Sequence, residues 1–305
     1  YLNTIITDVI MEGNKVSGLV VLSEMEPMEI HANVVIDCSG DAVVAAKAGA
    51  PYEIRPRKEI QPMTLMGKMA GINMEKLKNY YQDNPPVYDA EVPPAWRDFK
   101  TFPGLMHFGL KDELEHVQLP AHLEYLRNWL AIFTSTPNPG ELMINCSGAT
   151  EAHSIAGFDD RAEQETVSQK CLYDVAEVLR LYVPGCENAY LSSIASLLGI
   201  RESRRIIGDY KVTLDDFLAA REFEDSIGRG AMPAGAHTPD GVTMNVYDLD
   251  PGRSMTIPYR CMLPQNVEGL LVAGRCVSYE AEVANCIRCM AQCMAMGEAA
   301  GTAAA

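Results

Sequence analysis

The first residues alternate between apolar and polar side chains in a pattern typical of paired β-strands. The alternation covers residues 1–11, breaks at Glu12-Gly13-Asn14 and resumes over 15–22, so we expect two antiparallel strands joined by a tight turn. A further short strand is expected near residues 28–32. Together these residues predict a small antiparallel sheet.

Two later segments share a different pattern, in which a continuous apolar run ends at a glycine turn. In the first, residues 34–37 lead through such a turn into an alanine-rich stretch, 42–48, that predicts a short helix. In the second, residues 269–273 lead through Gly274 to a small-residue helix that ends near Gly301. An apolar strand that stops at a glycine and feeds a helix N-terminus brings backbone amides to a dinucleotide cofactor. The two segments predict an α/β cofactor enzyme.

Helical spacing of apolar residues predicts four helices between these two segments. One follows the capping residue Asn73 and extends to residue 81, and another begins with a capping box at Thr213. The other two are expected over 121–133 and 162–182. We expect this middle part of the chain to form a substrate domain.

Composition and charge narrow the functional classes. The chain has 305 residues, of which 48% are hydrophobic and 22% charged, enough to bury a large core in about two domains. No apolar run approaches the ~18 residues that span a bilayer. The net charge of -16 argues against a nucleic-acid surface, which needs clustered Lys and Arg. The sequence also lacks the motifs typical of serine hydrolases, zinc proteases and P-loop enzymes.

Nine cysteines at irregular spacing favour reduced thiols over a disulfide framework, and hence a cytoplasmic protein. On a helix, Cys286, Cys289 and Cys293 would share one face, with Cys276 upstream. Two interpretations follow: the thiols pack as small apolar groups, or they form part of an iron–sulfur or metal site. We favour packing, because cluster ligands usually come from loops that wrap around the cluster, so no metal site is predicted.

Sequence blocks spread over nearly the whole chain resemble the FAD-dependent oxidoreductases of the glutathione-reductase type. Four blocks occur in the family's order. The first comprises 35–41 and 48–52, the second 199–206, the third 257–260 and 263–264, and the fourth 271–275, 287–288 and 294–297. The resemblance implies FAD as cofactor and an α/β fold, in which a partial FAD/NAD(P)-binding, Rossmann-like domain carries an inserted α+β substrate domain. It places the C-terminal part of the first FAD-binding segment over 1–55, the substrate domain over 56–264 and the second FAD-binding segment over 265–305.

The sequence also departs from this family. The family begins with a Gly-x-Gly-x-x-Gly turn that holds the ADP half of FAD, whereas the nearest candidate here, 228–233, has proline in place of the third glycine and follows no apolar strand. We therefore expect an N-terminally truncated stretch of a longer protein, and a secretion signal on the missing part is left open. Ala281 stands where relatives commonly carry histidine, and Glu298 where glutamine is usual, so no catalytic role is carried over to position 281.

The two glycine turns carry the residues that the resemblance assigns to the cofactor. When FAD accepts a hydride, negative charge develops on its ring, and a nearby arginine or helix N-terminus stabilises that charge. The alternative is a glycine turn that only packs a strand against a helix. The predicted cofactor-binding residues are Ser39, Gly40, Asp41, Gly274, Arg275, Ser278 and Gly297.

Arginines are the first candidates for substrate binding. If residues 199–206 are helical, Arg201 shares a face with Arg204 and Arg205, and such a fork could bind a carboxylate. The alternative is that these arginines pair with acidic residues nearby. The resemblance favours Arg201 as the residue that faces the flavin or substrate, and Arg288 on the last helix is a similar candidate.

His237 and Tyr259 complete the predicted catalytic set, the first as a general base in a loop and the second as a polar group of the pocket. The resulting prediction is an FAD-dependent oxidoreductase that transfers a hydride between a small polar or anionic substrate and the flavin. The alternatives are a non-catalytic or partner-completed flavoprotein fragment and an iron–sulfur electron-transfer protein. We expect a small-molecule substrate and no nucleic-acid or membrane partner, and a homo-oligomer is left open.

Overall fold

The computed structural model describes residues 1–56, 59–85, 106–128, 131–145, 158–238 and 244–305. The chain divides into two compact units, each built from separate stretches of sequence. Unit 1 comprises residues 1–55, 202–236 and 245–305, and unit 2 comprises residues 56–201 and 237–244.

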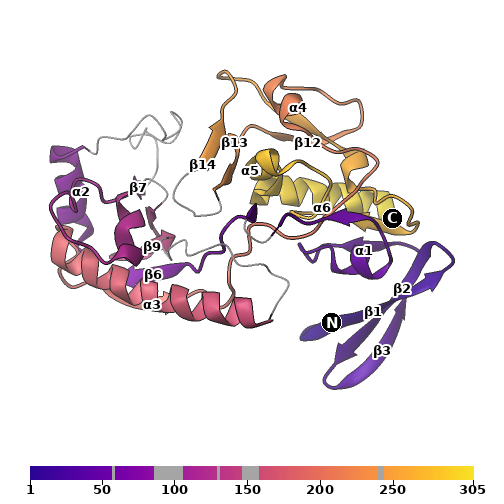
Figure 1. The fold of residues 1–305 in the computed structure, drawn as a ribbon, viewed down its shortest axis with the longest axis horizontal. Helices are drawn as coiled ribbons and strands as arrows, with labels where there is room; N and C mark the ends of the chain where they lie inside the picture. Colours follow the sequence, from indigo (N-terminus) through magenta and orange to yellow (C-terminus); the bar gives the residue numbers. More distant parts are fainter. Residues whose placement is uncertain (57–58, 86–105, 129–130, 146–157, 239–243) are drawn as a thin grey trace. The chain divides into compact units, whose positions relative to one another are not determined.

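Unit 1 contains an antiparallel meander, which confirms the strands predicted from the alternating pattern. Its strands are β1 (Thr4–Glu12), β2 (Lys15–Ser23) and β3 (Glu26–His31), in that spatial order, at the indigo end of Figure 1. The turn between β1 and β2 contains Gly13, whose φ of 65° lies in the left-handed region that glycine adopts without strain.

A pair of parallel strands, β4 (Val35–Asp37) and β16 (Leu270–Val272), forms part of the unit 1 core. The short helix α1 (Val43–Lys47) follows β4, so the first predicted strand–turn–helix segment is confirmed. Short parallel strands are stable only when their faces are covered. Helix α6 (Met290–Ala304) packs against β4 and provides such cover.

The rest of unit 1 consists of short elements. Helix α4 (Leu214–Leu218) begins with the predicted capping box, in which Thr213 Oγ1 accepts from the Asp216 amide at 3.1 Å and the Asp216 carboxylate accepts from the Thr213 amide at 3.0 Å. The other elements are β5 (Tyr52–Glu53) paired with β11 (Arg205–Ile206), β12 (Ser226–Gly230) paired with β15 (Met255–Pro258), and 3-10 helices at Tyr259–Met262 and Ala281–Val283.

The helix expected through the C-terminal cysteines is interrupted. Helix α5 (Ala284–Arg288) ends before Cys289, whose extended backbone separates it from α6. Cys286, Cys289 and Cys293 therefore do not share one helix face, and that expectation was wrong. Cys286 is buried against β12, where a side chain on Gly230 would overlap the Cys286 sulfur.

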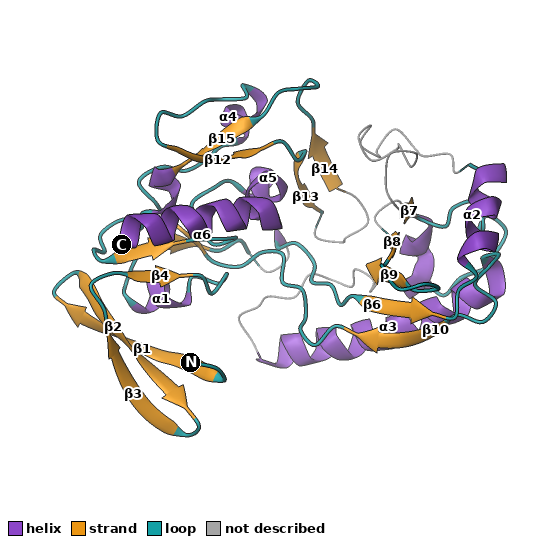
Figure 2. Cartoon of the chain, turned by 180° about the vertical axis from the view of Figure 1, so that it is seen from behind, coloured by secondary structure: helices purple, strands orange, loops and turns teal. Residues whose placement is uncertain are grey.

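Unit 2 is built on a five-stranded antiparallel sheet with helix α3 (Phe158–Tyr182) packed along it (Figure 2). Gly67 allows a close approach, since a Cβ at this position would lie 3.2 Å from the methyl groups of Leu172. In spatial order the strands are β10 (Tyr190–Ile194), β6 (Gly67–Ala70), β9 (Leu142–Asn145), β8 (Ile132–Ser135) and β7 (Met106–Phe108).

Two helices of unit 2 test the predictions made from apolar spacing. Helix α2 (Met74–Asp83) begins as expected, with the Asn73 side chain accepting from the Lys76 amide at 3.0 Å. The helix expected over 121–133 was wrong in its second half. A 3-10 helix covers Ala121–Arg127, and the residues from Ile132 onward form β8. None of the described helices is both long and apolar enough to cross a membrane.

The chain passes between the units at the two-stranded sheet of β13 (Ala234–His237) and β14 (Met244–Tyr247), and also near residues 55 and 201. The first of the predicted boundaries, at residue 55, coincides with a boundary between units. Residues 202–236 and 245–264 were expected in the substrate domain, whereas they belong to unit 1 together with both glycine turns. The assignment of the units to cofactor and substrate stays a prediction.

His107 on β7 makes the stability of unit 2 depend on pH. The residue is 3% exposed and its ring stacks on Tyr81, with centroids 4.0 Å apart, and burial lowers its pKa to about 3. Below the unfolded pKa of about 6.5, the unfolded state binds a proton that the folded state does not. Stability is therefore lost as the pH falls, at about 1.4 kcal/mol per unit, until the pH approaches the folded pKa.

We expect His107→Gln to remove most of this pH dependence, because the replacement does not titrate. Urea unfolding at about pH 7 and about pH 5 measures the difference for wild type and variant. His122, whose side chain is 43% exposed, provides the control, and His122→Gln should keep the wild-type difference. Equal pH dependence in wild type and His107→Gln would contradict the prediction.

Candidate flavin site

The two glycine turns predicted from the sequence lie next to each other in unit 1. Strands β4 and β16 run parallel with Asp37 opposite Val272, so both strands end at the same edge. Beyond this pair, the amide of Ala273 donates to the Asp37 carbonyl at 3.1 Å. The segments 38–41 and 274–275 therefore follow neighbouring strand ends, the position where α/β sheets bind ligands.

The carboxylate of Asp37 shapes the first turn. Asp37 is 1% exposed, and its oxygens accept from the amides of Ser39 (3.0 Å), Val44 (2.9 Å) and Ala45 (3.0 Å). The N-cap of α1 is Ala42, whose side chain cannot accept a hydrogen bond, so Asp37 supplies the missing acceptor. Sequence reasoning assigned Asp37 only to the strand. Its position, a carboxylate directly at the end of an apolar run, was the signal that could have revealed this role.

Ser39 and Gly40 keep the first turn tight. Ser39 Oγ accepts from the amides of Asp41 at 3.3 Å and Val43 at 3.0 Å. Gly40 has a φ of 72°, and a Cβ at this position would lie 2.8 Å from Cζ of Arg275. A larger residue at position 40 would be strained and would also displace the arginine.

Arg275 connects the two turns. Its Nη2 donates to Asp41 Oδ1 at 2.8 Å, and its Nε is buried with no hydrogen-bond partner in the described part of the chain. The adjacent Gly274 has a φ of 97°, and no described atom lies within 4 Å of the position that a Cβ would take. A guanidinium with an unused donor, beside open space, is suited to a polar ligand.

Arg288 and the first turn of α6 add positive charge to unit 1. Arg288 Nη2 donates to Asn285 Oδ1 at 2.9 Å, while its Nε is buried without a partner among the described residues. Burial and the Cys289 thiol raise the pKa of Cys293 in the first turns of α6, whereas the charges of Arg275 and Arg288 oppose this rise. The positive charges of both arginines are therefore felt at Cys293, in the N-terminal part of α6. This end of the helix has no side-chain cap and carries the positive end of the helix dipole.

The arginine fork expected around Arg201 is not formed. Residues 201–204 are irregular, and Arg205 lies in β11, so their side chains have different partners. Arg201 donates to the Pro62 carbonyl at 2.6 Å, and Arg204 Nε donates to the Asp41 carbonyl at 2.7 Å. The expectation of a helical fork was wrong, because pairing of β11 with β5 fixes an extended backbone here.

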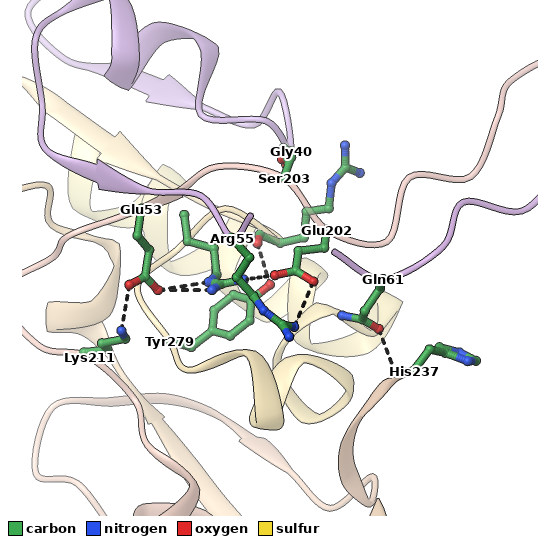
Figure 3. Close-up of polar contacts among 11 residues, drawn as sticks. Gly40, Glu53, Arg55, Gln61, Glu202, Ser203, Lys211, His237 and Tyr279 are labelled. Atoms are coloured by element: carbon green, nitrogen blue, oxygen red, sulfur yellow. Dashed lines mark hydrogen bonds and ion pairs between the residues drawn. The ribbon is translucent and has the colours of Figure 1, made fainter. Parts of the chain in front are cut away.

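Arg205 forms ion pairs with Glu202 and Glu53, which are labelled in Figure 3. Its Nη1 donates to Glu202 Oε1 at 2.7 Å, and its Nε and Nη2 donate to Glu53 Oε1 at 3.2 and 3.1 Å. The guanidinium lies 5.3 Å from the ring centroid of Tyr279. Burial raises the pKa of Tyr279 to about 12, and its hydroxyl donates to the Arg275 carbonyl at 2.7 Å. Sequence reasoning missed this network.

The other predicted site residues occupy separate positions. The amide of His237 donates to Gln61 Oε1 at 3.2 Å, and the His237 ring extends away from that contact (Figure 3). Tyr259 is half-buried and packs against the unit 1 core. Ser278 is 1% exposed, and Gly297 is exposed on α6 with no described atom within 4 Å of a Cβ position.

Comparison with known proteins identifies the family. No curated protein sequence matches the chain. Among solved structures, a geranylgeranyl bacteriochlorophyll reductase-like protein from Thermoplasma acidophilum is 15% identical with a TM-score of 0.33. The similarity covers 65% of this chain and 37% of that protein, so this chain matches well under half of that protein's length. Residues 1–305 match the family model described as FAD dependent oxidoreductase, and the chain therefore belongs to this family, whose cofactor is FAD.

Proposed function

We propose that the two turns of unit 1 hold FAD and that the protein transfers a hydride between the flavin and a small polar or anionic organic substrate. The observation that carries this proposal is the unused Nε donor of Arg275 beside the open space at Gly274. The residues that would hold the cofactor are those of the segment 39–41 together with Gly274 and Arg275. When bound, FAD would supply the hydride chemistry.

The residues of these turns fit a flavin. The open space at Gly274 admits a planar group close to the backbone, and the neighbouring Arg275 side chain is partly exposed and has an unused donor. Arg288 and the N-terminus of α6 add positive charge, which favours a negatively charged flavin ring over a neutral one. This local positive charge is opposite in sign to the net charge of -16. Salt screens the exposed acidic side chains, so their effect on the site is weak. Ser278 and Gly297 stay predictions as cofactor contacts.

Substrate binding and proton transfer are assigned to Arg201, His237, Tyr259 and Arg288. The unused Nε of Arg288 supports a role in holding a carboxylate or another anion. His237 is fixed through its backbone by Gln61, and an imidazole is suited to accept or return a proton near neutral pH. The substrate is proposed to be a small molecule.

Gly274→Val is expected to remove bound FAD from the purified protein, because the branched side chain would occupy the open space. Gly252 offers a matched control, since it has a φ of 86° and likewise no described atom within 4 Å of a Cβ position. Either substitution should cost about 1–3 kcal/mol of stability, because both positions require a positive φ. The flavin content, measured by visible absorbance, should fall only in Gly274→Val. Full flavin content in Gly274→Val would show that this turn is only structural.

Arg275→Met is expected to weaken FAD binding by about 10- to 150-fold, which corresponds to the loss of one charge-assisted hydrogen bond of about 1.5–3 kcal/mol. Arg275→Lys should give a smaller loss, because it retains the charge without the planar donor set. Arg229→Met is the control, since Arg229 pairs with Glu222 on the surface, where their side chains are 57% and 70% exposed. Fluorescence titration with FAD measures the effect, and equal affinities in Arg275→Met and Arg229→Met would exclude Arg275 from the site.

A further inference from the structure

We propose that Ser203, Arg204 and Tyr279 are positioning residues, which hold the two flavin turns in the geometry that binds the cofactor. They contact the backbone carbonyls of the turns rather than the space beside them. The inference rests on the proposed function, because these turns are the ones assigned to FAD.

The first turn is held through two consecutive carbonyls. Ser203 is 2% exposed, and its hydroxyl donates to the Gly40 carbonyl at 3.2 Å (Figure 3). Arg204 Nε donates to the next carbonyl, that of Asp41, at 2.7 Å. The Arg204 guanidinium is itself placed over the ring of Tyr52, 5.8 Å from the centroid. These contacts restrict rotation of both peptide planes in the turn.

The second turn is held through the carbonyl of Arg275, to which the Tyr279 hydroxyl donates. Tyr279 is 1% exposed, and its ring lies beneath the guanidinium of Arg205. Arg205 is fixed in turn by Glu202 and Glu53. Residues 202–205 therefore contribute to holding both turns. They contact the first turn directly, and they hold the second through the contact between Arg205 and Tyr279.

Asp41 explains why these contacts affect binding as well as stability. Its carbonyl accepts from Arg204, and its carboxylate accepts from Arg275, whose unused Nε is the donor proposed for the cofactor. Rotation of the Asp41 backbone would therefore move that donor. A turn that is already in its bound geometry avoids the cost of being ordered when the ligand binds.

Hydrogen–deuterium exchange of the protein without added flavin tests whether the turns are held in this way. Ser203→Ala and Arg204→Met should increase exchange at the amides of Asp41 and Val43 by about tenfold, which corresponds to about 1.4 kcal/mol of local opening. Tyr279→Phe should do the same at the Val277 amide, which donates to the Gly274 carbonyl at 3.3 Å. Ser203→Thr keeps the hydroxyl and should restore slow exchange.

A second cluster in unit 1 provides matched controls. Tyr210 donates to Asp216, and Arg221 lies 5.9 Å from the Tyr210 ring centroid, so the cluster has the same residue types as the Arg205–Tyr279 stack. Tyr210→Phe and Arg221→Met should leave exchange in both turns unchanged. Faster exchange throughout unit 1 in the Ser203, Arg204 and Tyr279 variants would overturn the inference, because it would show a general loss of stability.

FAD titration of the same variants separates the inference from the proposed function. We expect wild type and both controls to bind FAD with equal affinity, reduced by the lack of a Gly-x-Gly-x-x-Gly turn, and the three positioning variants to bind it about tenfold more weakly than wild type. If the turns open faster but the affinity is unchanged, the positioning role is overturned and the proposed function stands. If the wild-type protein has no affinity for FAD while exchange follows the expected pattern, the proposed function fails, and the role of these residues in flavin binding fails with it.

Discussion

The carboxylate of Asp37 accepts three backbone amide hydrogens at the point where β4 ends, and the first turn and α1 take their positions from these bonds. A buried carboxylate is costly unless its oxygens are well supplied with donors, and here the donors are amides that would otherwise lack acceptors. The carbonyl of the same residue accepts from Ala273 and so aligns the end of β16. One residue thus fixes the local shape of the first turn and its distance from the second.

Charge is distributed unevenly in this acidic protein. Arg204, Arg205 and Arg275 in unit 1 all have acidic or carbonyl partners, which hold the guanidinium groups in place without neutralising the region completely. Among the described residues, the buried Nε atoms of Arg275 and Arg288 have no hydrogen-bond partner and are donors available to a ligand. A buried donor without a partner costs stability, and such a cost is typical of sites that are completed by a bound group.

Local patterns in the sequence were sufficient for the meander, the first strand–turn–helix segment and the caps at Asn73 and Thr213, because neighbouring residues determine these features. The spacing of apolar residues over 121–133 wrongly predicted one helix. The buried residues at helical intervals belong first to a 3-10 helix and then to strand β8. The arginine fork failed because Arg205 pairs with Glu53, which is 152 residues away in the sequence. The roles of Ser203 and Tyr279 depend on similarly distant contacts, so no local pattern reveals them.

The division of unit 1 into three stretches of sequence has a consequence for biosynthesis. Asp41 and Arg275 are 234 residues apart, so the ion pair between the turns cannot form until the last stretch has left the ribosome. Until then, the apolar strand β4 lacks its partner β16, and an unpaired apolar strand edge of this kind is prone to aggregation. Closing such a long loop also slows folding relative to a contiguous domain of the same size. Truncations that remove β16 should therefore be more harmful to unit 1 than their length suggests, because β4 then loses its parallel partner.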